Sequence, residues 1–466
     1  MIERRYSNKR IGYTKQLEEN PFDRDSRSVP LMRFVLHSSS LADEILSEDS
    51  PAHRLVKVNC LKEIEVIPLP TDKNSMRKRF SDNGLVFSEY FPQESRVVLK
   101  LSDGSIHDVT SPFANRLPEN LWEPIISNSN VTLANLWAST KIGDYLVVSK
   151  TEPSLKCKVA RNSIITAEQA LEMVRIILTA HNRFYLSAEE PVTEWSYYLY
   201  RTRKIFKGLH YASMVVFSAH GKEPPEKIHN HFRSLMTRLN FICRAYDKIA
   251  FFCLKTPNYN DQDSQLYHLV YFVMLITGVF DGLAYIIHEF YHMNIDKSEY
   301  LDLRVLEDNE NKKAKKFYQD IQFNNPALYQ FLTAADTQSD IKTFYPLRNS
   351  LVHRELLVGV QLQNGSEPAK NVFEINSETY ERLKELSNSF TFISGSNPSF
   401  LDPFLFIKWA QEVTIRIVDR VVSSIDWDSV CITLPLDTQD KVHASNESYE
   451  QEFGQLLGWS EEPLYF

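Results

Sequence analysis

The chain has 466 residues, of which 43% are hydrophobic and 24% are charged, and its formal net charge is −8. This length supports two or three domains with substantial cores, and the composition is ordinary for a soluble globular protein. The acidic balance excludes a generally basic nucleic-acid-coating protein, although not a local basic surface. Five cysteines without a CxxC pair favour reduced thiols. Because the N-terminus also lacks an apolar secretory segment, we expect a cytoplasmic protein.

Residues 1–158 predict a mixed α/β N-terminal domain. Short apolar or β-branched runs, broken by Asn, Asp, Pro and Gly, are typical of strands. No catalytic constellation stands out here, so the role of this domain is left open. The expected strands are residues 31–36, 55–58, 64–67, 85–87, 96–101 and 145–148.

Residues 165–430 predict an all-α helical bundle, which gives the whole chain an α+β fold class. Prolines at the start of apolar, helical-period segments mark expected first turns, because proline needs no hydrogen-bond acceptor there. We expect helices over residues 166–187, 192–219 and 263–294, with further helices starting at Pro225, Pro326, Pro346 and Pro403.

The most apolar segment, residues 269–287, could be mistaken for a membrane span. It contains Asp281 and is flanked by His268 and His288. Ionisable groups are costly inside a bilayer, so the segment is predicted to be a buried core helix, and no membrane is expected. Residues 437–466 carry seven acids against one lysine and predict an acidic C-terminal tail.

The segment Arg348-Asn349-Ser350-Leu351-Val352-His353 is the most informative in the chain. Pro346 predicts that a helix begins just before it. Asn349 and His353 are four residues apart and would share one helical face, and the long Arg348 side chain can reach it. A cation, an amide and an imidazole at a helix N-terminus, where backbone N–H groups are free, predict a phosphate-binding site.

This pattern resembles the HEPN superfamily of α-helical bundles, which carry an Arg-x(4–6)-His motif, often with Asn after the Arg. Those proteins commonly have an acidic residue on an upstream core helix, and Asp281 in Gly-Val-Phe-Asp-Gly stands at the matching place. The resemblance covers residues 165–430. It implies a homodimer formed through the helical domain, sometimes with a regulatory partner, and a setting in toxin or antiviral-defence systems.

The resemblance also implies a metal-independent endoribonuclease with no cofactor. The 2′-hydroxyl of RNA would attack the neighbouring phosphate. His353 would act as base or acid, since the imidazole pKa lies near neutrality. Arg348 would bind the phosphate, Asn349 would orient it, and Asp281 would hold Arg348 in place. The basic runs 201–207 and 312–316 could steer RNA towards the site or simply be solvated.

Two alternatives stay open from the sequence. In the first, the protein is a non-catalytic interaction or RNA-binding module, and Arg348 and His353 only cap and pack a helix. His288-Glu289-Phe290-Tyr291-His292 is an HExxH sequence, which on a continuous helix would give two zinc ligands and the general base of a metalloprotease.

Overall fold

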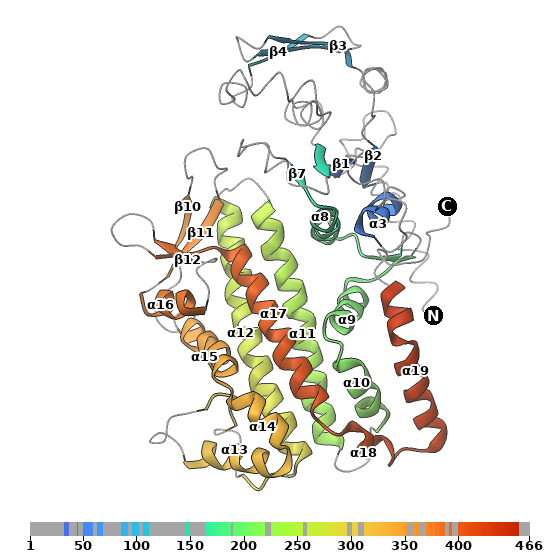
Figure 1. Cartoon of the computed structure of the whole chain (residues 1–466), viewed down its shortest axis with the longest axis vertical. Coiled ribbons are helices and arrows are strands. Elements are labelled where there is room, and N and C mark those ends of the chain that lie inside the picture. The colour runs from blue at the N-terminus through green and yellow to red at the C-terminus, as the bar shows by residue number, and fades with distance from the viewer. Residues whose placement is uncertain are drawn as a thin grey trace. The chain divides into compact units, whose positions relative to one another are not determined.

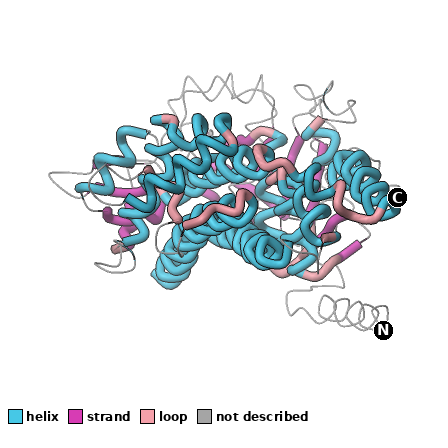
Figure 2. Tube along the Cα trace, turned by 90° about the horizontal axis from the view of Figure 1, so that it is seen from below, coloured by secondary structure: helices cyan, strands magenta, loops and turns pink. Residues whose placement is uncertain are grey.

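The computed structural model describes residues 32–36, 44, 50–58, 63–68, 85–91, 96–101, 106–110, 145–148, 164–187, 190–219, 225–254, 259–295, 301–305, 312–349, 351, 358–362, 370–375, 377–386, 391–393 and 399–455. Helices make up most of this described chain (Figure 2). The chain divides into two compact units, residues 1–191 with 458–466, and residues 192–457.

The first unit contains a parallel sheet in the order β2-β1-β6-β7, of which β1, β2 and β7 are labelled in Figure 1. Its strands are β1 (Met32–Leu36), β2 (Ile64–Pro68), β6 (Tyr145–Val148) and β7 (Ile164–Ile165). Helix α3 (Pro51–Val58) connects β1 to β2, as a parallel pair requires. A separate antiparallel sheet joins β3 (Leu85–Phe91), β4 (Arg96–Leu101) and β5 (Ile106–Thr110).

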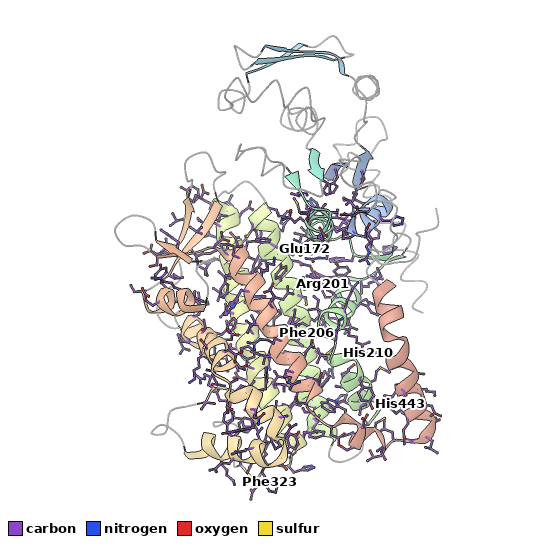
Figure 3. The ribbon with its side chains drawn as sticks, in the orientation of Figure 1. Glu172, Arg201, Phe206, His210, Phe323 and His443 are labelled. Carbon is purple, nitrogen blue, oxygen red and sulfur yellow. The ribbon has the colours of Figure 1, made fainter. Side chains whose placement is uncertain are left out.

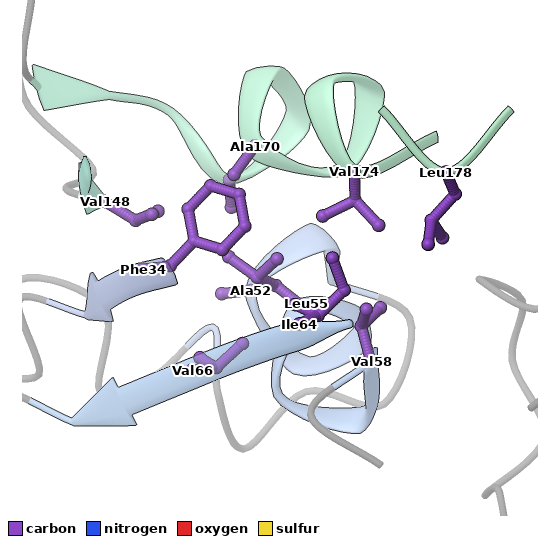
Figure 4. Packing of buried hydrophobic residues seen from close by; sticks show 11 residues of the cluster. Phe34, Ala52, Leu55, Val58, Ile64, Val66, Val148, Ala170, Val174 and Leu178 are labelled. Carbon is purple, nitrogen blue, oxygen red and sulfur yellow. The ribbon is translucent and has the colours of Figure 1, made fainter. Parts of the chain in front are cut away.

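Helix α8 (Ala167–Ala180) covers the parallel sheet together with α3. Phe34, Leu55, Val148 and Val174 are fully buried in this core (Figure 4). Since α8 packs here, the first compact unit reaches Pro191, beyond the predicted boundary at residue 158. The unit ends with a short ribbon of β8 (Tyr185–Ser187) and β9 (Glu190–Pro191).

Five of the six predicted strands form at or near their expected positions, and the one over residues 55–58 is wrong. Those residues are the second half of α3. The backbone N–H of His53 donates to the Ser50 hydroxyl, which therefore caps the helix, and Pro51 occupies the first turn. The signal lay in the Ser-Pro pair upstream of the apolar run.

The second unit is built around two long antiparallel helices, α11 (Pro225–Leu254) and α12 (Tyr259–Phe290), which lie side by side (Figure 1). Helices α9 (Glu194–Ile205) and α10 (Leu209–Ser218) pack against α11. Helices α13 (Lys312–Asn324), α14 (Pro326–Thr333), α15 (Ala335–Asn349) and α17 (Pro403–Ser423) complete the bundle. Helix α18 (Trp427–Cys431) is followed by α19 (Leu436–Gln455), so the predicted tail is helical at least to Gln455.

The sequence predicted that this unit is all-α, and that prediction is wrong. In the described residues it contains an antiparallel sheet in the order β10-β11-β13-β12. Its strands are short and the helix α16 (Ser377–Leu386) interrupts them, so they gave no long alternating pattern. They are β10 (Gly359–Leu362), β11 (Lys370–Ile375), β12 (Thr391–Ile393) and β13 (Ser399–Leu401). The chain is therefore mostly helical with a small antiparallel sheet in this unit.

Helix α12 is long and apolar enough to cross a membrane, but 67% of its most apolar 18-residue window is buried within the structure. Phe272, Ile276, Phe280 and Leu283 are completely buried there. The prediction of a core helix is compatible with this packing, as in a soluble protein.

Two of the proline-marked helix starts have the expected caps. Asn325 accepts from the backbone N–H of Leu328, and Asp402 accepts from the N–H groups of Phe404 and Leu405. The start at Pro346 is wrong, because Pro346 lies inside α15 and the helix begins at Ala335. The carbonyl of Lys342 consequently receives no hydrogen bond from position 346.

Candidate functional site

A polar cluster forms where the C-terminal half of α12 meets the end of α15. We call it the Asp281 cluster. It contains Asp281 of α12, Asp302 and Arg304 of the segment 301–305, and Tyr345 and Arg348 of α15. The packing of α12 against α15 brings these distant parts of the sequence together.

Asp281 accepts a hydrogen bond from the Tyr345 hydroxyl at 3.0 Å. Burial raises the pKa of Asp281 above its usual value, and the Asp302 carboxylate adds to this rise. The Tyr345 hydrogen bond and the charges of Arg348 and Arg304 oppose it. Burial and the Asp281 carboxylate also raise the pKa of Tyr345, so the tyrosine stays protonated and serves as the donor.

Arg304 completes the other side of the cluster. Its guanidinium carbon lies 3.9 Å from the centroid of the Tyr345 ring, which is a cation–π contact. Its Nε donates to Asp302 Oδ2 at 2.8 Å, and its backbone N–H donates to Asp302 Oδ1 at the same distance. Arg304 is thus fixed by an aromatic ring and a carboxylate at once.

Arg348 and Asn349 lie in the last turn of α15, not in the first turn of a helix. Free backbone N–H groups occur in the first turn of a helix, and α15 begins at Ala335, about three turns before Arg348. The predicted contribution of helix N–H groups to phosphate binding is therefore wrong for Arg348 and Asn349. Any attraction for phosphate has to come from the side chains.

The structure brings Arg348 and Asp281 within electrostatic range of each other, since the charge of Arg348 acts to lower the pKa of Asp281. These two described side chains form no hydrogen bond or ion pair, so Asp281 does not hold Arg348 directly. Arg348 is half-buried and Asn349 is exposed. His353 lies outside the described residues, so the structure does not place the third residue of the motif.

Sequence reasoning missed Tyr345, Asp302 and Arg304. Tyr345 lies one helical turn before Arg348, so its position facing the same neighbour could have been inferred from helical spacing. Asp302 and Arg304 lie outside any helix or strand, and no local pattern marks them. Their contribution depends on tertiary packing alone.

The HExxH sequence does not form the geometry of a zinc site. Helix α12 ends at Phe290, and His292 adopts a left-handed backbone conformation with φ of 48°. His288 and His292 are therefore not on adjacent turns of one helix, which zinc ligation by this motif requires. No group of three potential metal ligands occurs among the described side chains.

The basic run at residues 201–207 is partly structural. Arg201 of α9 (Figure 3) is buried and forms an ion pair with the buried Asp247, which also accepts from the Tyr198 hydroxyl at 3.1 Å. Arg201 therefore joins α9 to α11 and cannot steer RNA. In the second run, Lys316 donates to the carbonyl of Asn294, and the side chains of Lys312, Lys313 and Lys315 lie outside the described residues.

No family model, no curated protein and no solved structure matches this chain. The chemistry of the Asp281 cluster therefore has to be inferred from its own residues.

Proposed function

We propose that this protein is a HEPN-type, metal-independent endoribonuclease that uses Arg348, Asn349 and His353, with Asp281 in a supporting role. The observation that supports this most is the 3.0 Å hydrogen bond from Tyr345 to Asp281, which places the core-helix acid beside the residue one helical turn before Arg348. The HEPN pattern calls for such an acid beside the motif arginine.

The hydrogen bond from Tyr345 changes the role of Asp281 in this proposal. A carboxylate that is largely removed from water needs a partner, and Tyr345 provides it without engaging the guanidinium of Arg348. Arg348 then has its donors available for the two oxygens of a scissile phosphate. Asp281 and Asp302 keep the cluster from being strongly cationic, which avoids repulsion between Arg304 and Arg348.

The reaction follows from the chemistry of RNA. The 2′-hydroxyl loses its proton to a base, its oxygen attacks phosphorus, and the bond to the 5′-oxygen breaks as that oxygen gains a proton. The products are a 2′,3′-cyclic phosphate and a free 5′-hydroxyl. His353 serves as one of the two proton-transfer groups, and Arg348 stabilises the charge on the phosphorane. A second copy of the chain would supply the other histidine in a homodimer.

We further propose a cytoplasmic setting in toxin or antiviral defence, which rests on the same resemblance. The direct experiment compares RNA cleavage in EDTA by the wild type, Arg348→Ala and His353→Ala. The matched control is Arg420→Ala, which removes an exposed arginine of α17 outside the cluster.

Loss of cleavage in both motif variants, with full activity in Arg420→Ala, is the expected result. Equal cleavage by all four proteins would contradict the proposed site. A wild type that binds RNA without cutting it would favour the alternative of a non-catalytic RNA-binding module.

A further inference from the structure

On one side of the α11/α12 pair, aromatic side chains are left exposed by the described part of the bundle. Tyr267 is 68% exposed and Tyr271 is 36% exposed. Large aromatic residues at successive turns of a core helix are normally buried, so their exposure on α12 is unusual for packing alone.

Each of these tyrosines contacts at least one neighbouring ring. The rings of Tyr267 and His268 are 5.3 Å apart at 74°, and those of Tyr271 and Phe241 are 6.3 Å apart at 44°. Phe252 of α11 stacks on His268 with an interplanar angle of 24°. Because Tyr267 and Tyr271 are one helical turn apart, both groups of rings lie along the same side of α12, next to α11.

Two cations of α11 share the helix face of Phe241 and Phe252, because Phe241, Arg244, Lys248 and Phe252 follow one another at gaps of three, four and four residues. Arg244 is close enough to influence both Tyr271 and His268 electrostatically, and Lys248 influences His268. Burial and these two cations lower the pKa of His268. Arg244 also pairs with Glu194 at 2.9 Å while its side chain stays 46% exposed. We call Phe241, Arg244, Lys248, Tyr267, His268 and Tyr271 the aromatic–basic face.

The same stripe of α12 leads from this face to the Asp281 cluster. Tyr267, Tyr271, Met274, Gly278 and Asp281 follow one another at gaps of four, three, four and three residues, which keeps them on one side of the helix. Met274 is 43% exposed on that path. The rise of an α-helix puts Tyr267 about 21 Å from Asp281, roughly the length of six stacked nucleotides.

We propose that the aromatic–basic face binds single-stranded RNA by base stacking and leads it to the Asp281 cluster. Rings accept unpaired bases of any sequence, and interleaved cations follow the phosphates, which is the combination that single-strand-binding proteins use. In a duplex the base faces are stacked on one another, so the tyrosines would not increase its binding affinity. The identity of the nucleic acid rests on the proposed nuclease function.

The test measures binding of a fluorescein-labelled 12-nucleotide oligouridylate to the full chain by fluorescence anisotropy in EDTA. The parent protein is His353→Ala, so that cleavage does not consume the probe. Tyr267→Ala is compared with Tyr267→Trp, which keeps a stacking ring, and with Phe323→Ala, which removes an aromatic residue that is 87% exposed on α13 (Figure 3).

Tyr267→Ala is expected to weaken binding about tenfold, since loss of one stacked base typically has an effect of this order. Tyr267→Trp and Phe323→Ala should bind like the parent. A three-nucleotide oligouridylate is too short to span both sites, so the parent protein should bind it more weakly than the 12-nucleotide probe.

Several results would overturn the proposal. They are no RNA binding by the parent, equal binding by Tyr267→Ala, or an equal loss in Phe323→Ala. A Tyr267→Ala protein that loses self-association while RNA binding is unchanged would assign the face to a second copy of the chain. If RNA binding depends on Tyr267 but the wild type never cleaves RNA, the face stands and the nuclease proposal fails.

Discussion

At the scale of single residues, the Asp281 cluster shows how one largely buried acid is satisfied by a neutral donor. Asp281 accepts from Tyr345, and the ring of Tyr345 in turn supports Arg304. The expectation that Asp281 holds Arg348 by an ion pair is therefore replaced by a weaker, through-space coupling. Among the described residues, Arg348 is therefore not held by Asp281 in an ion pair.

Tyr345→Phe isolates the hydrogen bond from the ring contact. The variant keeps the aromatic face under Arg304 and removes only the hydroxyl that donates to Asp281. We expect the free energy of unfolding at pH 7 to fall by about 1 to 3 kcal/mol, because a largely buried carboxylate loses its donor. Chemical denaturation measures this, and an unchanged midpoint and slope would mean that the hydrogen bond is replaced by water.

Asp281→Asn tests the raised pKa of Asp281. A carboxyl whose pKa is higher in the folded than in the unfolded protein binds protons more readily when folded. Wild-type stability therefore falls as the pH rises from about 4, the usual Asp value, through the folded pKa, and this effect is constant above it. In the variant, the amide oxygen accepts the Tyr345 hydrogen bond but the side chain does not titrate.

The stability of Asp281→Asn relative to wild type should consequently increase with pH over that window. Unfolding free energies at pH 4, 5, 6 and 7 for both proteins give the difference. A difference that decreases with pH would show that the folded pKa is lowered, contrary to the dominance of burial.

At the scale of elements, proline alone did not locate a helix start. Pro326 and Pro403 follow Asn325 and Asp402, whose side chains cap the helices that begin there. Tyr345 precedes Pro346 and cannot cap in this way, and the helix runs through the proline. For these three prolines the preceding side chain separates a helix start from a helix interior, and the difference decides whether Arg348 lies near the free N–H groups of a first turn.

Longer elements could be predicted where the apolar spacing persists, as in α11 and α12. The strands β10 to β13 could not, because three to six residues give too little alternation to separate a strand from a loop. For the site, the sequence pointed to Asp281 beside Arg348, but not to Asp302, Arg304 or Tyr345. Those residues meet only once α12, α15 and the segment 301–305 have packed.

Pro346→Ala distinguishes the interior of a helix from its first turn. At an interior position, alanine restores a backbone N–H and removes the clash between the proline ring and the carbonyl four residues earlier. The free energy of unfolding should therefore rise by about 1 to 3 kcal/mol. Pro403→Ala, at the start of α17, is the control and should give no gain. Thermal and chemical unfolding of both variants provide the comparison, and a loss of stability in Pro346→Ala would contradict the helix bounds of α15.

At the scale of the whole molecule, the second compact unit has its own core. Phe232, Leu239, Phe280 and Ile417 are completely buried and come from α11, α12 and α17. The Asp281 cluster and the aromatic–basic face both lie within residues 192–457. The chemistry proposed for the protein therefore needs no residue of the described first unit.

Residues 192–457 expressed alone should fold. A core of this size, drawn from long helices in contact, is enough for independent stability. We expect a strongly helical circular dichroism spectrum and a single cooperative unfolding transition. A fragment that is soluble but unfolds without cooperativity would show that the first unit contributes to this core.

The most direct measurement is the chemistry of the RNA ends produced in EDTA by the full chain. Mass spectrometry of a defined oligoribonucleotide should show 2′,3′-cyclic phosphate and 5′-hydroxyl ends with the wild type, and intact RNA with His353→Ala. Products with 5′-phosphate ends, cleavage that requires an added divalent metal, or cyclic-phosphate products from His353→Ala would contradict the proposed function.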